Sequence, residues 1–364
     1  MSIDIRFTEE DWERIERDWN AWWAGELERP MVVLENYEPA AGDPVKLLPP
    51  GGRPIYFPLD VPVEEMMDCY GFLLERTRFY GDAFPRWWPD FGAGIVAGFL
   101  GARVRPAPET VWFESPGALS IEALQLEYDE GNLWWRRIQA INAYTLQHWD
   151  NQVCLGHTDL GGNLDILASF RGAQQLLMDL YDAPEEVARL AGQITSLWLR
   201  YYNEIDRVVS KTGRGTSPWA AIWSPGRCYM LQSDFSYMIS PRMFERFVLP
   251  DLYACCQALD HGFYHLDGKG QLPHLDHLLS IERLRGIQWV PGDGTPPPES
   301  WLPLLSRIRA AGKRCQLNVP FEGARKIVRA LGGKGFAFHI EKDRNLTPQE
   351  AQGMVDELLD LSSR

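Results

Sequence analysis

Hydrophobic and polar positions in the second half of the chain form short apolar runs separated by longer stretches of helical periodicity. The runs are rich in β-branched and aromatic residues and end at glycine, proline or charged residues, which is typical of buried strands. In chain order they are "QVCLGHTDL", "SPWAAIWSPG", "GFYHLDG", "GIQWVPGDG", "RCQLNVP" and "GFAFHIEK". Two similar runs, "RPMVVLEN" and "GAGIVAGFLG", lie nearer the N-terminus. We predict a strand in each run.

The stretches between the runs predict amphipathic helices, and three of them carry a helix start signal. In such a signal a side-chain oxygen accepts a hydrogen bond from an orphan backbone N–H, or a proline occupies the first helical position. The signals are Asp182 with Glu185, Ser240 with Pro241, and Thr347 with Pro348 and Glu350. We therefore expect helices to begin at these three places.

Strands that alternate with helices indicate βα units and a mostly parallel α/β sheet. Eight runs match the strand number of a (β/α)8 TIM barrel, and we predict this fold as a single domain over residues 1–364. An open doubly wound sheet is the alternative, but it usually has a glycine-rich turn after its first strand, and "MVVLENYEP" contains no glycine. Residues 1–30 are expected to form a helical N-terminal extension that covers the barrel or packs on a second subunit.

Charge and hydropathy restrict the partners of the protein. The 364 residues carry a formal net charge of -14 without a basic block, which argues against nucleic acid as a partner. No apolar run reaches transmembrane length, and the acidic N-terminal segment is not a signal peptide. The six cysteines include no C-x-x-C pair, so reduced thiols are expected. These features predict a cytoplasmic protein that acts on a small molecule.

Tryptophan is unusually frequent, with 15 residues. One explanation is packing between helices and sheet, because tryptophan is usually highly buried. The other is an aromatic wall around a flat or sugar-like ligand. The sequence leaves both open.

Candidate chemistry lies at the ends of the predicted strands, because a β/α barrel forms its active site at the carboxyl ends of its strands. A histidine followed two residues later by an acid recurs at three of these ends: His157 with Asp159, His265 with Asp267, and His339 with Glu341. Residues two apart on a strand share a face. We expect His265 and Asp267 to face a cavity at the mouth of the barrel, although a single histidine at such a place more often bonds a loop carbonyl.

The sequence resembles the uroporphyrinogen decarboxylase superfamily, which includes corrinoid-linked methyltransferases. The resemblance rests on "RPMVVL", "GNLDILASFRGAQQLLMDLYDAPEEVARL", "SDFSYMISPRMFERFVLPDL", "YHLDG" and "GFAFHIEKDRNLTPQEAQGMVDEL". Apart from the first, these segments lie between Gln152 and the C-terminus. The resemblance implies the barrel fold, but most of these phrases are structural and do not identify a substrate.

At two positions the sequence departs from the family pattern, and both departures bear on which reaction the protein catalyses. The porphyrinogen decarboxylases follow the "RP-x-V" strand with an arginine-rich segment, whereas this chain has the acidic "LENYEPAAGD". The methyltransferases hold zinc with His-x-Cys and a late cysteine. Here His265 matches the histidine, Asp267 replaces the first cysteine, and the late position falls near Glu341 or Lys342. The resemblance therefore implies an oxygen-rich site for a divalent metal, with zinc as a candidate, at His265, Asp267 and Glu341.

The leading hypothesis is a metal-assisted methyltransferase or demethylase that works with a corrinoid protein. Asp234, His157 and Asp267 are the predicted catalytic residues, and for Asp234 a helix-capping or loop role is the alternative. Residues near the predicted strand ends are expected to contact the substrate: Trp223, Arg227, Lys269, Asp293 and Asn318. Asp293 lies between two glycines, so an Asx turn is its alternative role.

Three other functions remain open. A metal-free decarboxylase would hold its substrate carboxylate with Lys269, Arg227 and Lys342. A glycoside hydrolase would need two paired carboxylates, which no spacing identifies. The third is a barrel that binds a corrinoid or another ligand without catalysis. The sequence does not predict the oligomeric state.

Overall fold

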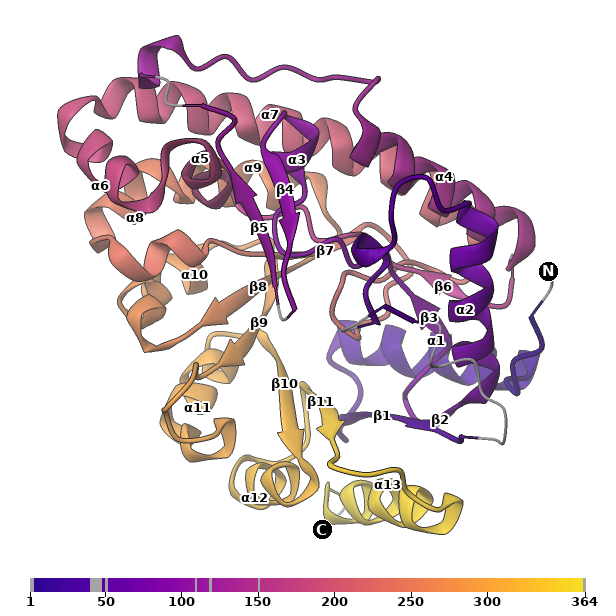
Figure 1. Ribbon diagram of the computed structural model, residues 1–364. Coiled ribbons are helices and arrows are strands. Elements are labelled where there is room, and N and C mark those ends of the chain that lie inside the picture. The colour runs from indigo at the N-terminus through magenta and orange to yellow at the C-terminus, as the bar shows by residue number, and fades with distance from the viewer. Residues whose placement is uncertain are drawn as a thin grey trace.

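A seven-stranded mixed sheet forms the framework of the protein (Figure 1). The structure is a computed structural model that describes residues 3–39, 48–49, 52–108, 110–117, 120–149 and 151–362. The strand order is β2-β1-β11-β10-β9-β8-β7, with only β2 antiparallel to its neighbour. The strands are β1 (Met31–Tyr37), β2 (Thr77–Gly81), β7 (Cys228–Leu231), β8 (His261–Asp267), β9 (Leu284–Val290), β10 (Arg314–Pro320) and β11 (Phe336–Glu341).

A second, shorter pair of strands lies between the two ends of the parallel part of this sheet. β3 (Arg86–Trp87) pairs in parallel with β6 (Cys154–Leu155), and in Figure 1 both lie between β7 and β1. Within the described ranges no strand pairing joins β3 to β1 or β6 to β7. The structure therefore shows an α/β protein with a mostly parallel sheet, while closure of the predicted barrel is not established by hydrogen bonding. A separate hairpin joins β4 (Arg103–Pro106) to β5 (Val111–Glu114).

Five of the predicted strands are confirmed as β1, β8, β9, β10 and β11, and the run at residues 152–160 contains the two-residue β6. Two predictions were wrong. Residues 217–226 form bends and isolated bridges, and the strand begins later, at Cys228. Residues 92–101 contain helix α3 (Val96–Phe99), because a short apolar run suits a buried helix as well as a buried strand.

Helices cover the sheet, with α1 on its inner face and the others outside. Their bounds are α1 (Glu9–Ala24), α2 (Val63–Arg76), α4 (Leu133–His148), α5 (Asn163–Arg171), α6 (Ala173–Asp182), α7 (Pro184–Val209), α8 (Pro241–Phe247), α9 (Leu249–Ala258), α10 (Leu275–Ser280), α11 (Leu302–Ala310), α12 (Phe321–Leu331) and α13 (Pro348–Ser362). None of the described helices is both long and apolar enough to cross a membrane.

Two of the three predicted start signals are confirmed. The Ser240 hydroxyl accepts a hydrogen bond from the Met243 N–H at 3.4 Å. A capping box joins Thr347 and Glu350, with backbone-to-side-chain distances of 2.8 and 3.3 Å. Asp182 does not cap α7. It is the last residue of α6, and only one residue separates the two helices.

Helix α1 confirms the predicted N-terminal helix, and its tryptophans serve packing. Trp12, Trp19, Trp22 and Trp23 are buried in a core cluster with residues of β1, β6, β7, β8 and β11: Met31, Val33, Cys154, Met230, Phe263 and Ala337. The alternate residues on β1, β8 and β11 point to the opposite face of the sheet. They pack with the outer helices in a second core cluster: Val32, Leu34, Tyr264, Leu266, Phe338 and Ile340. The sheet thus has an inner face, covered at its amino-terminal end by α1, and an outer face under the other helices.

Candidate metal centre

The inner face of the sheet changes from apolar to polar toward the carboxyl ends of the strands. Because side chains on a strand alternate between faces, the polar positions follow the apolar ones at intervals of two residues. The change runs from Phe263 to His265 and Asp267 in β8, from Ala337 to His339 and Glu341 in β11, and from Val33 to Glu35 in β1. Groups that can bind metal or transfer protons therefore gather at one end of the sheet.

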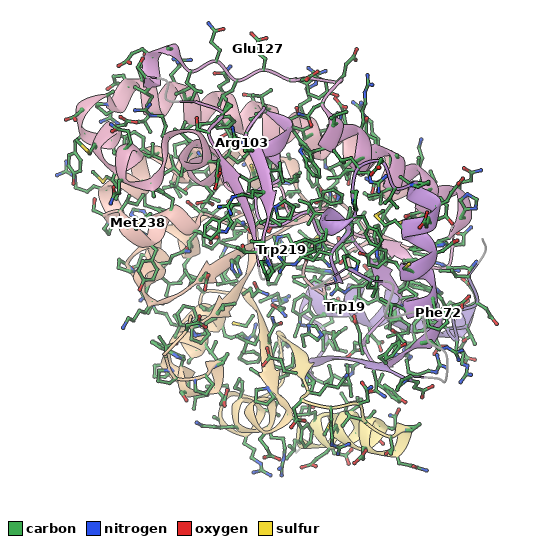
Figure 2. All side chains as sticks on the ribbon, in the orientation of Figure 1. Trp19, Phe72, Arg103, Glu127, Trp219 and Met238 are labelled. Carbon is green, nitrogen blue, oxygen red and sulfur yellow. The ribbon has the colours of Figure 1, made fainter. Side chains whose placement is uncertain are left out.

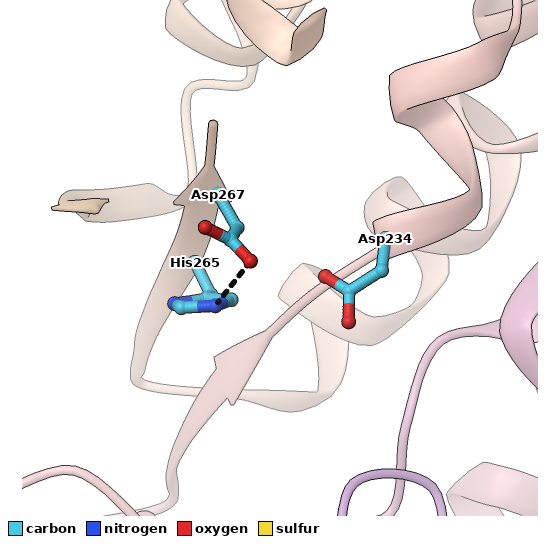
Figure 3. A group of neighbouring side chains, drawn as sticks. All are labelled: Asp234, His265 and Asp267. Atoms are coloured by element: carbon cyan, nitrogen blue, oxygen red, sulfur yellow. Dashed lines mark ion pairs between the residues drawn. The ribbon is translucent and has the colours of Figure 1, made fainter. Parts of the chain in front are cut away.

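Three of these groups meet in a cluster formed by Asp234, His265 and Asp267. One nitrogen or oxygen atom from each residue lies within 4.8 Å of the other two. His265 Nε2 lies 3.9 Å from Asp267 Oδ2, and Asp234 points toward this pair from the segment after β7 (Figure 3). The His265 side chain is 16% exposed and that of Asp267 is 42% exposed. Solvent thus reaches the carboxylates while the imidazole is largely enclosed.

Asp165 holds the segment that carries Asp234. Its carboxylate accepts hydrogen bonds from the backbone N–H groups of Asp234 at 3.1 Å and of Phe235 at 2.7 Å. Asp165, in the first turn of α5, therefore caps the backbone N–H groups of this segment, and the Asp234 side chain does not. This leaves the Asp234 carboxylate facing His265 and Asp267.

Crowded carboxylates perturb one another at this site. Desolvation by the surrounding protein and the nearby charge of Asp267 raise the pKa of Asp234 to about 6, although its side chain reaches solvent. Burial and then the charge of Asp234 raise the pKa of Asp165 to about 7. Burial lowers the pKa of His265, so its imidazole is neutral near pH 7. Neutral imidazole and ionised carboxylate are the forms that bind metals.

A chain of amide side chains orients His265. Gln288 Oε1 is hydrogen-bonded to His265 Nδ1. Gln288 Nε2 in turn donates to Gln316 Oε1 at 2.6 Å, and Gln316 Nε2 donates to Asn318 Oδ1 at 3.0 Å. Because Gln288 presents its carbonyl oxygen, Nδ1 carries the imidazole proton and Nε2 presents a lone pair to the carboxylates. Metal-binding histidines are usually held in this way by a partner on the other ring nitrogen.

The donor set fits a divalent cation. A bare imidazole nitrogen and two carboxylates are all hydrogen-bond acceptors, so His265, Asp234 and Asp267 cannot stabilise one another without a cation or a proton between them. Catalytic metal sites usually have three protein ligands and keep positions open for water or substrate, and imidazole nitrogen and carboxylate oxygen are both ligands of divalent cations.

Further polar and aromatic side chains surround the cluster. Trp219, labelled near the middle of the view in Figure 2, packs edge-on against His265, with ring centroids 5.2 Å apart. Arg86 Nη1 donates to the Trp219 carbonyl at 3.3 Å, and Arg86 Nε lies 3.4 Å from Glu35 Oε1. His339 is the strand partner of Asn318. These residues form a mixed polar and aromatic lining beside the candidate metal ligands.

The structure brings together only some of the predicted site residues. His265 and Asp267 share the cluster with Asp234, and Asn318 joins it through the amide chain. Glu341, predicted as a metal ligand, is exposed at the end of β11 and is outside the cluster. Asp234 stands in its place. Lys269 and Asp293 are exposed in the segments that follow β8 and β9.

Three predicted residues lie elsewhere. His157 is buried against α7, where it stacks on Tyr202 at 4.5 Å and its Nε2 lies 3.5 Å from Asp206. The Trp223 indole is buried in the core cluster of α1 and donates to the Arg214 carbonyl at 2.8 Å. Arg227 precedes β7 and contacts Asn203 and the Tyr202 ring. Trp223 and Arg227 do not lie at the end of a strand, because residues 217–226 do not form the predicted strand and β7 begins after them.

Gln288, Gln316 and Trp219 were not predicted as site residues. A signal for the two glutamines exists in the sequence, because each is a polar residue inside a predicted buried strand, "GIQWV" and "CQLNV". Their role could not be inferred from it, since it depends on the pairing of β8, β9 and β10.

Comparison with known proteins identifies a fold rather than a family. No protein-family model matches the sequence, and no curated protein does. Among solved structures, the chain is similar to a methyltransferase from Methanosarcina mazei, with a TM-score of 0.51 and 10% sequence identity. The match covers 77% of this chain and 81% of that one. At this identity, the chain shares its α/β fold with a methyltransferase.

Proposed function

We propose that the protein is a divalent-metal-dependent enzyme that removes a methyl group from an oxygen-bearing small molecule. The observation that carries the proposal is the arrangement of His265, whose Nε2 lone pair faces the carboxylates of Asp234 and Asp267. We further propose that the fold is a barrel of the uroporphyrinogen decarboxylase type and that a corrinoid protein accepts the methyl group. The fold similarity to a methyltransferase supports this choice of reaction.

Hard ligands favour an oxygen substrate over a thiol. A cation bound by one histidine and two carboxylates would act as a Lewis acid that polarises a methoxy or hydroxyl oxygen. Asp267 and His265 are the expected ligands, and Gln288 keeps Nε2 of His265 unprotonated. Zinc is a candidate ion, since it accepts mixed nitrogen and oxygen ligands.

Asp234 is suited to proton transfer when His265 and Asp267 alone hold the cation, because a carboxylate bound to the metal would not keep its proton. Without a bound cation, desolvation and the charge of Asp267 raise its pKa to about 6, so both protonation states are populated near pH 6. When the methyl group departs, the oxygen that remains needs a proton, and Asp234 is the acid positioned to donate it. The edge of Trp219 beside His265 would offer an apolar surface for the carbon skeleton of the substrate.

The direct test is the metal content of the purified protein, measured by mass spectrometry. We expect one divalent ion per chain in the wild type and its loss in His265→Ala and in Asp267→Ala. His277→Ala, in α10 and outside the cluster, is the matched control and should keep the ion. Unchanged metal content in both cluster variants would refute the proposal. If the protein binds metal but demethylates no methoxy compound, the metal site is confirmed and the proposed reaction is refuted.

The geometry supports metal-free decarboxylation less well. That reaction needs cations around a substrate carboxylate, and Arg227 lies against Asn203 and Tyr202 instead. Lys269 is exposed beyond Asp267 and would be the nearest candidate.

A further inference from the structure

A cavity of about 330 Å³ opens at the amino-terminal ends of β9 and β10. β8, β9 and β10 are parallel, so this cavity lies at the opposite end of the sheet from the candidate metal centre. The end of α1 and the turns that precede β9 and β10 form its walls. Its lining includes Trp23, Glu282, Arg285, Lys313 and Arg314. Three cations thus share one small cavity with a single acidic residue.

The cations of this cavity lack carboxylate partners. Among the described parts of the chain, no ion pair joins Arg285, Lys313 or Arg314 to an acidic side chain. Some other partly buried arginines have a carboxylate partner at 2.6 to 2.7 Å: Arg29 with Asp82, Arg171 with Asp179, and Arg214 with Glu9. Arg137, by contrast, is buried and donates to the Val61 carbonyl at 2.7 Å.

Lys313 is the most enclosed of the three cations, and its contacts indicate that an anion binds beside it. The residue is 6% exposed, and its ammonium group donates to the carbonyls of Ile281 at 2.6 Å and Leu284 at 2.7 Å. The carbonyls fix the position of Nζ but bring no negative charge, and a lysine has a third N–H to donate. A buried charge without a counter-ion is costly, so an anion in the cavity would stabilise this arrangement.

Arg314 is also held in place by neutral groups. Its guanidinium donates to the carbonyls of Trp22 at 2.9 Å and Trp23 at 3.1 Å, at the end of α1. Arg285 is exposed and lines the same cavity. Guanidinium groups match phosphate geometry and donate two parallel hydrogen bonds to it.

We propose that this cavity binds the phosphate group of a small molecule through Arg285, Lys313 and Arg314. A volume of about 330 Å³ is at the small end of the range for ligand sites, which suits a compact phosphorylated metabolite. Trp23 provides an apolar wall for the remainder of such a molecule. This second site goes beyond the function proposed above and does not depend on it.

The test is calorimetric titration with inorganic phosphate at constant ionic strength. We expect saturable binding by the wild type and binding at least about tenfold weaker in Arg285→Ala, since a charge-assisted hydrogen bond is lost. Because Arg285 is exposed, this variant should fold, and its melting curve checks that. Glu282→Gln should bind phosphate more tightly, because it removes the one acidic group of the lining.

Two controls separate this site from others. Arg242→Ala removes the same charge from an exposed position in α8 and should leave phosphate binding unchanged. His265→Ala should also leave it unchanged, because phosphate would otherwise be binding at the metal centre. The proposal is overturned if the wild type shows no saturable binding, if Arg285→Ala and Arg242→Ala have equal effects, or if His265→Ala abolishes binding.

Discussion

The carbonyl oxygen of the Gln288 side chain is hydrogen-bonded to Nδ1 of His265, on the neighbouring strand. This one contact decides which imidazole nitrogen faces the carboxylates of Asp234 and Asp267. It also ties the metal centre to the amide chain that continues through Gln316 to Asn318.

Replacing Gln288 should therefore weaken metal binding without removing a ligand. In Gln288→Leu the proton of His265 is free to move to Nε2, and we expect the metal affinity to fall by about 10- to 100-fold. Gln288→Glu keeps an acceptor and should retain most of the affinity. Metal titration measures the affinity, and the nitrogen chemical shifts of His265 report its tautomer.

The control for this prediction is Gln352→Leu, an exposed change in α13 that should have no effect on metal binding. If Gln288→Leu binds metal as tightly as the wild type, Gln288 does not position His265.

The raised pKa of Asp234 predicts a pH-dependent gain in stability for Asp234→Asn. Without metal, the folded wild type holds the Asp234 proton up to a pKa of about 6, whereas the unfolded chain releases it near 3.8. The wild type therefore loses stability relative to the variant as the pH rises from about 4 to 6, and the difference is complete above about 7. Because the side chain reaches solvent, the gain should be about 1 kcal/mol or less.

Urea unfolding of the metal-free proteins at pH 4.5 and pH 7.5 measures this difference. Asp293→Asn, at an exposed position, is the control for the general effect of an aspartate-to-asparagine change. An Asp234→Asn protein that is no more stable than the wild type at pH 7.5 would mean that desolvation and the charge of Asp267 do not raise the pKa of Asp234 in the folded state.

His157 should contribute to stability rather than to metal binding. It is fully buried and stacks on Tyr202 beside Asp206. We expect His157→Ala to lower the free energy of unfolding by about 2–4 kcal/mol, because it leaves a cavity and an unpaired carboxylate. Its metal content should equal that of the wild type. If the His157→Ala protein folds but contains no metal, then His157 contributes to metal binding and the prediction is wrong.

The tryptophans of α1 should be essential to the inner core. Trp22 is 1% exposed, and its indole donates to the Phe336 carbonyl at 3.2 Å. Trp22→Ala should reduce the free energy of unfolding by about 3–5 kcal/mol. Trp112, which is 53% exposed, is the control, and Trp112→Ala should change stability by about 0.5 kcal/mol or less. Equal effects in urea unfolding would show that α1 does not close the core.

Local patterns in the sequence determined much of the framework. The alternation in "GFYHLDG" placed His265 and Asp267 on one face, because side chains two apart on a strand point the same way. The signals at Ser240 and Thr347 located two helix starts, since capping depends only on residues within one turn. The acidic helix at the N-terminus and its tryptophans were also readable, although not the face of the sheet that they cover.

Tertiary structure alone decided which strand ends meet. Asp234 rather than Glu341 completes the cluster, because Asp165, distant in sequence, anchors the loop after β7. His157 faces α7, and the two-residue strand β6 is too short for alternation to specify a face. Gln288 and Gln316 became partners of His265 only through strand pairing. Contacts between distant segments depend on which strands pair and in what order, and the alternation within a single strand does not specify its neighbours.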